Sequence, residues 1–380
     1  MDLPSVALFG VDIIRFTIDL GNTYALYLVV SLTLNLEAGY AGVPNFGKVM
    51  FVAGGAAIAG SVCGRLAAII LAVNTYPDYN GSIARIISDT NSSLLHNPLL
   101  SVELLLLGLV LAAGVGAGLG FLASYPAIRL REDYLGMLLL ASAQFFQLFL
   151  SGYTPFIGGT GGIEVPDVFG WVGTGIGFRD LVVLGFLGLF AILVYFYFER
   201  IARSPLGRTL RAIRDNEVAS RALGKNDVAF RRNVIIIASA ISGMAGALIA
   251  FEDGAVGPGS WTRITWTFWI WVMVIMGGSA NNLGVALGAL SFTFLFKTLN
   301  LVKFQFSNYV PFDVNWLQYL MFASLVILFL IARPGGILPE KSSTTLPRRT
   351  VAEIMEPRPK PIEGSETSEN RSTSPETNPG

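Results

Sequence analysis

Histidine and cysteine, the side chains most often used for nucleophilic or metal chemistry, each occur once in 380 residues, as His96 and Cys63. One cysteine excludes an intrachain disulfide and a thiolate metal cluster, and one histidine argues against a histidine-rich metal site. The sequence offers no Ser-His-Asp constellation or paired buried carboxylates, and it contains no GxxxxGK[ST] phosphate-binding loop. We therefore expect a chain that is not an enzyme, holds no metal or cofactor, and does not hydrolyse ATP.

The polar residues that could do chemistry are gathered in one segment, residues 204–232, which reads SPLGRTLRAIRDNEVASRALGKNDVAFRR. Residues 199–232 carry nine basic side chains against four acidic ones. Pro205 stands where a helix can begin, because its missing N–H is not needed in the first turn. Gly224 is placed to end the helical segment, since glycine tolerates the left-handed conformation just beyond a helix. The pattern predicts a short, strongly basic pair of helices.

Two kinds of binding fit such a helix pair. A basic amphipathic helix can lie on anionic lipid, or it can dock into a groove on a protein partner. The Arg-Asp-Asn-Glu group at residues 214–217 favours a partner, because acidic and amide groups add little affinity for anionic lipid but supply specific hydrogen bonds to protein. Both readings stay open at this point.

The rest of the chain has the composition of a membrane protein. It is 53% hydrophobic and 14% charged, where soluble domains carry about a quarter charged residues, and its mean hydropathy is +0.59. The net charge of +0 gives no basic surface for nucleic acid. Crossing the hydrocarbon core takes roughly 20 apolar residues in a helix. We predict an all-α, polytopic transmembrane helix bundle of about nine spans (eight to ten), near residues 22–36, 49–73, 102–123, 134–150, 181–198, 233–251, 266–276, 284–301 and 316–331.

The distribution of basic residues predicts the orientation. Lys and Arg collect on the cytoplasmic side, which places the loop at residues 204–229 inside, together with residues 124–133 and the chain beyond Arg333. The N-terminus would then lie outside, and the first segment is expected to be retained because residues 1–5 lack the basic start of a signal peptide. We divide the chain into a transmembrane domain, residues 1–338, and a polar tail, residues 339–380, that buries too little apolar surface to order.

Small and aromatic residues suggest how the spans are arranged. Glycines four apart allow close helix packing in lipid, as at Gly114 with Gly118, Gly116 with Gly120, and Gly284 with Gly288; Ser239, Gly243 and Ala247 repeat the spacing on another span. Packing alone is the simpler interpretation, and a substrate path the less favoured one. The tryptophans at 261, 266, 269 and 271 are expected to anchor helices at the outer membrane boundary.

The polar segment resembles a known motif. Residues 207–226, GRTLRAIRDNEVASRALGKN, are similar to the coupling loop of branched-chain amino-acid permeases of ABC importers, a divergent form of the EAA motif. In that family the loop seats in a cleft of an ATP-binding subunit and transmits its closure to the spans. The resemblance implies these ATPase-coupling residues here: Ala212, Ile213, Arg214, Asp215, Asn216, Glu217, Ala219, Leu223 and Gly224.

Further motifs follow in the family's order. GYAGVPNFG at residues 39–47 resembles its early glycine-rich element, although the family more often has Gln-Leu-Ser-Leu-Gly-His where this chain has residues 43–48. YPAIRLREDY at 125–134, GGTGG at 158–162, MGG at 276–278 with NLG at 282–284, and RPGGI at 333–337 are similar to later family motifs. The resemblance covers residues 34–338 and points to the LivM-type member of the permease pair.

Glycine-rich breaks in apolar regions can leave half-helix ends that offer N–H groups to a carboxylate and carbonyls to an ammonium group, which suits an amino acid. Simple tight turns are the alternative interpretation. Arg65 either lies near this path or extends to the membrane surface, because a charge inside a span is costly. The candidate path residues are Gly42, Asn45, Gly47, Arg65, Gly277, Gly278 and Asn282.

The resemblance implies a permease subunit in the cell membrane that takes up branched-chain amino acids by alternating access. Its expected partners are two ABC ATPase subunits, a second related permease, an extracytoplasmic substrate-binding protein and membrane lipid, with no nucleic acid. A urea or short-chain amide permease of the same superfamily shares these motifs. An ion-coupled secondary transporter would need ionisable residues within its spans, and few are present, chiefly Glu37, Arg65 and Glu103.

Overall fold

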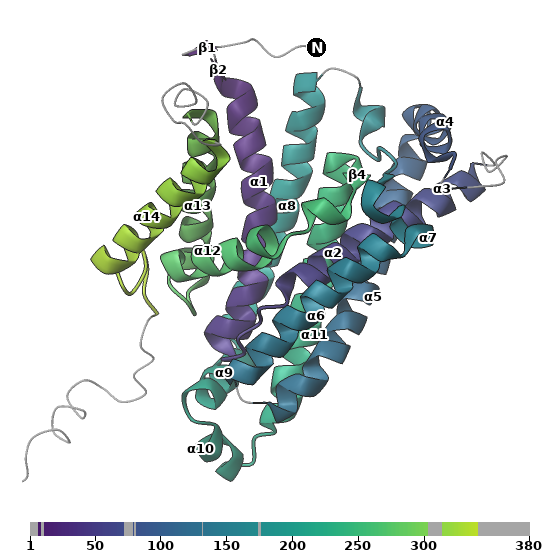
Figure 1. The fold of residues 1–380 in the computed structure, drawn as a ribbon. Coiled ribbons are helices and arrows are strands. Elements are labelled where there is room, and N and C mark those ends of the chain that lie inside the picture. Colours follow the sequence, from purple (N-terminus) through teal and green to yellow (C-terminus); the bar gives the residue numbers. More distant parts are fainter. Residues whose placement is uncertain are drawn as a thin grey trace, which may run out of the picture. The chain divides into compact units, whose positions relative to one another are not determined.

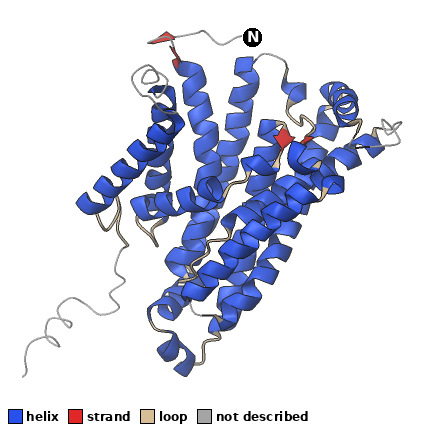
Figure 2. Ribbon diagram, in the orientation of Figure 1, coloured by secondary structure: helices blue, strands red, loops and turns tan. Residues whose placement is uncertain are grey.

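The computed structural model describes residues 7–8, 11–71, 79, 81–130, 132–173, 176–302 and 314–340. The chain divides into two compact units, Met1–Glu340 and Lys341–Gly380, and every described residue belongs to the first. This unit is almost entirely helical (Figure 2). The predicted tail falls largely outside the described residues, so its disorder and the boundary at residue 338 stay predictions.

Within the described residues, seven helical segments are long and apolar enough to cross a membrane: Ile13–Tyr40, Lys48–Ile70, Pro98–Pro126, Asp133–Gly152, Gly177–Arg203, Asp227–Asp253 and Asn282–Leu301. Two shorter apolar helices, Ile264–Gly277 and Tyr319–Ala332, correspond to the remaining predicted segments. Each of the nine predicted segments therefore coincides with an apolar helix, because long uncharged runs are a local property of the sequence. The prediction of an all-α polytopic bundle is confirmed.

The helices are labelled in Figure 1. The helices of the apolar segments are α1 (Ile13–Leu34), α2 (Lys48–Ile58), α3 (Gly64–Ile70), α5 (Pro98–Arg129), α6 (Glu132–Gly152), α8 (Ile176–Arg203), α11 (Asp227–Asp253), α12 (Trp269–Gly277), α13 (Asn282–Val302) and α14 (Val314–Ala332). The other helices are α4 (Ile83–Leu95), α7 (Thr154–Ile157), α9 (Pro205–Asp215) and α10 (Glu217–Ala222).

In the described part of the chain, three apolar helical segments contain a π-helical turn, a wider turn that often marks a functional site. The turn η1 (Asn35–Tyr40) ends α1, η2 (Ala59–Cys63) joins α2 to α3, and η6 (Ile264–Phe268) precedes α12. Short 3₁₀ turns occur at η3 (Gly159–Gly161), η4 (Gly170–Val172) and η5 (Pro258–Ser260).

The strands are short. β1 (Ala7–Leu8) pairs with β2 (Val11–Asp12), and β3 (Ile163–Glu164) pairs antiparallel with β4 (Ala255–Val256), with Ile163 opposite Val256. The second pair joins the loop after α7 to the loop after α11, so two segments distant in sequence are held together at one end of the bundle.

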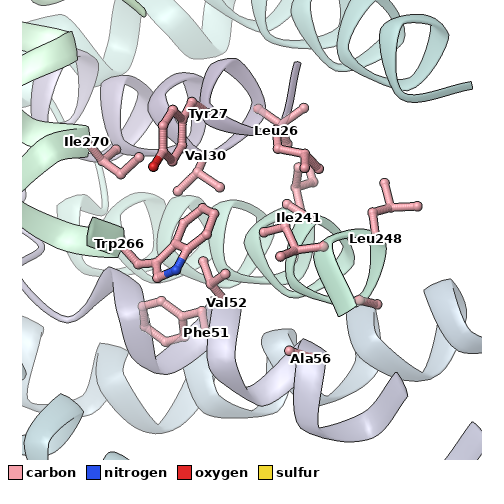
Figure 3. Close-up of a cluster of buried hydrophobic side chains, with 14 of the residues drawn as sticks. Leu26, Tyr27, Val30, Phe51, Val52, Ala56, Ile241, Leu248, Trp266 and Ile270 are labelled. Atoms are coloured by element: carbon pink, nitrogen blue, oxygen red, sulfur yellow. The ribbon is translucent and has the colours of Figure 1, made fainter. Parts of the chain in front are cut away.

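The core lies where α1, α2, α11 and α12 meet. Figure 3 shows side chains from all four segments converging, among them Tyr27 of α1, Phe51 of α2 and Ile241 of α11. Phe51 and Ile270 are fully buried. Because lipid tails are as apolar as these side chains, close packing rather than hydrophobic burial must hold such a core together.

Glycines allow α11 to approach α5 and α2 closely. A Cβ added at Gly243 of α11 would lie 2.5 Å from the Ala112 carbonyl oxygen of α5, and one at Gly120 would lie 2.7 Å from the Ser239 Cβ. The predicted packing role of Gly116, Gly120 and the Ser239 series is confirmed. It is wrong for Gly114 and Gly118, because nothing lies within 4 Å of a Cβ built at either position.

The tryptophans correct a second expectation. Trp261, Trp266 and Trp269 are buried inside the bundle, where Trp266 packs edge-on against Tyr27. Trp271 stacks on Phe46, and its indole N–H donates to the Asn45 carbonyl oxygen (3.2 Å). The prediction that these residues anchor helices at a membrane boundary is therefore wrong for the three buried ones; their sequence position did not reveal which side they face.

Candidate coupling site

The polar segment folds as the predicted helix pair. Figure 1 shows α9 and α10 together at one end of the bundle, between the ends of α8 and α11. Pro205 occupies the first turn of α9. Asn216 has extended backbone, which ends α9, and its side-chain oxygen accepts from the Ala219 N–H (3.0 Å), which starts α10. Gly224 has φ +75°, as expected for a residue that ends a helix.

One face of α9 is turned into the protein. Leu210 and Ile213 are buried, and a Cβ at Gly207 would lie 2.6 Å from the Ile201 carbonyl oxygen of α8. The guanidinium of Arg211 donates to the Ala202 carbonyl oxygen (2.9 Å) and lies over the Tyr40 ring. These contacts attach α9 rigidly to the end of α8.

Arg214 is the most connected side chain of α9. Its guanidinium donates to the Gly39 carbonyl oxygen in η1 (2.5 Å), to Glu340 Oε2 (2.9 Å) and to Asp215 Oδ1 (3.0 Å). Burial alone would lower the pKa of Arg214, but its bonds to Asp215 and Glu340 hold the pKa above the ordinary value. The side chain is therefore a fixed cation bound to three acceptors.

A second charged cluster attaches α10 to α11. Arg221 bonds to Glu217 and to both carboxylate oxygens of Asp227 (2.8 and 2.9 Å), and Arg231 lies 3.2 Å from Glu217. Hydrogen bonding to Asp227 is the main reason that the pKa of Arg221 lies above its ordinary value. The predicted contact residue Glu217 is thus engaged within the chain.

The remaining predicted coupling residues face outward. Ala212, Asp215, Asn216, Ala219, Leu223 and Gly224 are exposed, whereas Ile213 is buried and Arg214 is half-buried in the contacts above. Val218, which is not among the predicted coupling residues, is 78% exposed, close to the 80% of Leu223. Its apolar side chain among polar neighbours is the feature of the sequence that could have marked it as a candidate contact residue. Both apolar side chains lie outside the candidate spans and are open to solvent.

Three predicted path residues lie in the break between α1 and α2. Asn45 is buried, accepts from the Gly47 N–H (2.9 Å) and donates to Glu37 Oε2 (3.1 Å). Gly42 has φ +69°, and a Cβ there would lie 2.9 Å from the Arg214 side chain. Gly42 therefore lies against α9.

The same break contains an ion pair that the sequence argument did not identify. Lys48 Nζ lies 2.8 Å from Glu37 Oε2, and neither side chain is exposed. Lys48 also lies 3.4 Å from the hydroxyl of Ser242, which shares a hydrogen bond with Thr33 (2.9 Å). The available signal was Lys48 at the start of an apolar run, where an unpaired charge would be costly.

Three further predicted path residues, Gly277, Gly278 and Asn282, lie at the α12–α13 break. A Cβ at Gly277 would lie 2.6 Å from the Gly284 carbonyl carbon, and Gly278, at φ +103°, is pressed against Leu338. Asn282 is buried; it accepts from Asn35 (2.9 Å) and donates to Glu199 (2.9 Å). The glycines at this break therefore serve close backbone contact, and their role in a path stays a prediction.

Arg65 lies apart from both breaks, in α3. It donates to the Ser61 hydroxyl (2.8 Å) and to the Pro155 carbonyl oxygen, and it lies over the ring of Tyr79, 4.9 Å from the centroid. Its charge is thus bound by protein groups. Over the part of the chain that the structure describes, no group of three or more His, Cys, Asp and Glu side chains could hold a metal ion.

Known proteins resemble this chain over most of its length. Residues 17–330 match the family described as "Branched-chain amino acid transport system / permease component". The probable branched-chain amino acid transport permease protein LivM of Methanocaldococcus jannaschii is 36% identical over 335 residues, which are 88% of this chain and 95% of that protein.

Two bacterial relatives match a shorter part. The high-affinity branched-chain amino acid transport system permease proteins LivM of Salmonella typhimurium and Escherichia coli are 31% and 30% identical over 253 residues, which are 61% of this chain and 56% of each relative. No solved structure matches the chain. With a family match over most of its length and a relative that aligns almost end to end, the chain belongs to the permease family of branched-chain amino acid transport systems.

Proposed function

We propose that this chain is the transmembrane permease subunit of an ABC importer that takes up branched-chain amino acids and is driven by separate ATPase subunits. Its family and the names of its relatives support the substrate class. The observation that carries the proposal is the α9–α10 pair, which is fixed to the bundle by buried and ion-paired residues and leaves Val218 and Leu223 exposed. Such a surface suits a partner's groove better than anionic lipid, because Asp215 and Asn216 are exposed beside these apolar residues, and acidic and amide groups add little affinity for anionic lipid.

The assembly follows from this role. The chain works with two ATPases, one of which docks on α9 and α10, with a second related permease across the pore, and with a substrate-binding protein on the opposite face. The basic loop at residues 204–229 and the chain beyond Arg333 lie in the cytoplasm, as the charge distribution predicts. The chain itself binds no cofactor. ATP-driven closure of the ATPases moves the helix pair, and the spans open alternately to the two sides.

The docking test uses the exposed apolar residues. Charge reversal at Arg214 and Glu217 would disturb contacts inside the chain, whereas Val218→Asp with Leu223→Asp changes only the surface. We expect the tagged double variant to insert normally but to lose copurification with the ATPases by at least about tenfold, as for a desolvated apolar anchor. The matched control, Val218→Ile with Leu223→Met, should bind like the wild type. Absence of ATPase binding by the wild-type chain would overturn the ABC proposal.

A further inference from the structure

Arg214 lies at the junction of three segments that are far apart in the sequence. Its guanidinium joins α9 to Gly39, which is 175 residues away in η1, and to Glu340, which is 126 residues away at the end of the described chain. Asp215, its third acceptor, is 65% exposed, whereas Glu340 is 31% exposed and Gly39 is buried, so the two distant contacts are less open to solvent. Charge-assisted bonds from a planar guanidinium fix geometry as well as energy.

The Glu340 end of this junction is itself attached to the bundle. The Ile337 N–H donates to the Met276 carbonyl oxygen (2.8 Å), and the Leu338 N–H donates to that of Gly277 (3.0 Å). Gly336, at φ +76°, lies against Gly278, where a Cβ would come within 2.6 Å of the backbone nitrogen. Residues 333–340, which we call the C-terminal strap, thus connect the last turn of α12 to the coupling helix.

The contact with Gly39 is connected to buried polar residues inside the helix bundle. Gly39 shares η1 with Glu37, whose carboxylate bonds to Lys48 at the start of α2 and to Asn45. Lys48 in turn reaches Ser242 of α11. A Cβ at Gly39 would lie 2.6 Å from the backbone nitrogen of Ala280, so η1 also touches the α12–α13 break. A displacement of η1 therefore has to change its contacts with Lys48 of α2 and with the α12–α13 break. Through Lys48, it also affects the contact with Ser242 of α11.

The π-helical form of η1 makes this segment a suitable point of movement. A π-turn is a local interruption of the i to i−4 hydrogen-bond pattern of an α-helix, and such turns are frequent at functional sites. The buried Glu37–Lys48 pair opposes intermediate positions, since separating two desolvated charges is costly. Packed elements of this kind favour two discrete arrangements over gradual deformation.

We propose that Arg214 is a positioning residue, which transmits movement of α9 to η1 through the Gly39 carbonyl while the C-terminal strap, through Glu340, holds its guanidinium in place. This inference rests on the proposed function, and it assigns Arg214 to transmission inside the permease and not to ATPase binding. The relay has three parts: the helix α9, the guanidinium with its two inner acceptors, and η1 with the Glu37–Lys48 pair.

The test compares variants in the assembled transporter in proteoliposomes, with ATP supplied and labelled leucine carried by the binding protein. Arg214→Lys keeps the charge but cannot hold Gly39 and Glu340 together. We expect its ATPase binding to stay close to that of the wild type, while leucine transported per ATP hydrolysed falls at least about tenfold, the factor for one lost charge-assisted bond. Arg208→Ala, which removes an exposed arginine from the same helix, should leave this ratio unchanged.

A charge swap distinguishes the contribution of the Glu340 contact from that of the Gly39 contact. Arg214→Glu with Glu340→Arg restores an ion pair between α9 and the strap, but the new carboxylate cannot donate to the Gly39 carbonyl. We expect coupling to remain lost in the swapped variant. Recovery of transport by the swap would overturn the relay through Gly39, because the ion pair with the strap would then suffice.

A readout independent of transport is amide hydrogen exchange at residues 35–40 of the assembled complex. In the wild type, exchange there should differ between the ATP-bound and nucleotide-free states, and in Arg214→Lys the two states should become alike. If Arg214→Lys binds ATPases and keeps both wild-type coupling and the exchange difference, the relay is wrong while the proposed function stands. If the wild type binds no ATPase, both are wrong.

Discussion

The ammonium group of Lys48 lies 2.8 Å from the carboxylate of Glu37, and neither side chain reaches solvent. The pair spans the break between α1 and α2, with Asn45 donating to the same carboxylate oxygen. Because both charges are fully buried, the contribution of the pair to the free energy of unfolding can be tested separately from transport.

Removing one partner should destabilise the protein far more than removing both. Lys48→Met leaves a buried carboxylate unpaired, and we expect a loss of about 3–5 kcal/mol in the free energy of unfolding. Glu37→Met combined with Lys48→Met should recover most of that loss. Thermal unfolding of the purified chain in detergent gives the comparison. As a control, Lys297→Met breaks a pair with Asp19, which is 59% exposed, and should cost no more than about 1 kcal/mol. Equal costs for the two single variants would contradict the buried pair.

Gly39 has no room for a side chain. A Cβ there would lie 2.6 Å from the Ala280 backbone nitrogen and closer still to Asn35. Gly39→Ala should therefore shift η1 and cost about 1–3 kcal/mol, as overpacking does. Reduced thermal stability together with faster amide exchange at residues 35–40 would show the shift. A variant with wild-type stability and exchange would mean that the contact is looser than the structure has it.

Because α5 and α11 pack closely at some glycines only, replacing glycine by alanine should lower the free energy of unfolding at Gly243 but not at Gly114. Gly243→Ala would place a Cβ 2.5 Å from the Ala112 carbonyl oxygen and should destabilise by about 1–3 kcal/mol. Gly114→Ala meets nothing within 4 Å, and alanine favours a helix over glycine by about 1 kcal/mol, so it should be neutral or stabilising. Thermal midpoints of the two variants provide the check, and a loss at both positions would refute this packing arrangement.

Salt should weaken the attachment of α10 but leave the bundle intact. Arg221 is 55% exposed and pairs with Glu217 and Asp227, so its contacts are open to screening. In Arg221→Gln, amide exchange within residues 217–222 should rise while exchange in α11 beyond its first turn stays unchanged. The wild type at high salt should move in the same direction. Protection of α10 that is unaffected by both changes would show that apolar packing holds the helix.

Local features determined a large part of this protein from the sequence alone. Nine apolar runs predicted nine apolar helices, because the length of an uncharged run decides whether a helix can span the membrane. Pro205 and Gly224 located the helix pair, since their backbone restrictions act within a turn. The order of the family motifs pointed to the permease family that the comparisons then confirmed.

Only the tertiary structure decided which residues meet. The partners of Arg214 are Gly39 and Glu340, at separations of 175 and 126 residues, and no periodicity indicates such pairs. The pairing of Lys48 with Glu37 likewise became apparent only from the placement of α2 beside η1. The expectations for the buried tryptophans and for Gly114 were wrong for the same reason, because the sequence does not show which neighbour a helix face receives. An amino-acid type limits the contacts a residue can make, but the neighbour it receives depends on how the helices pack.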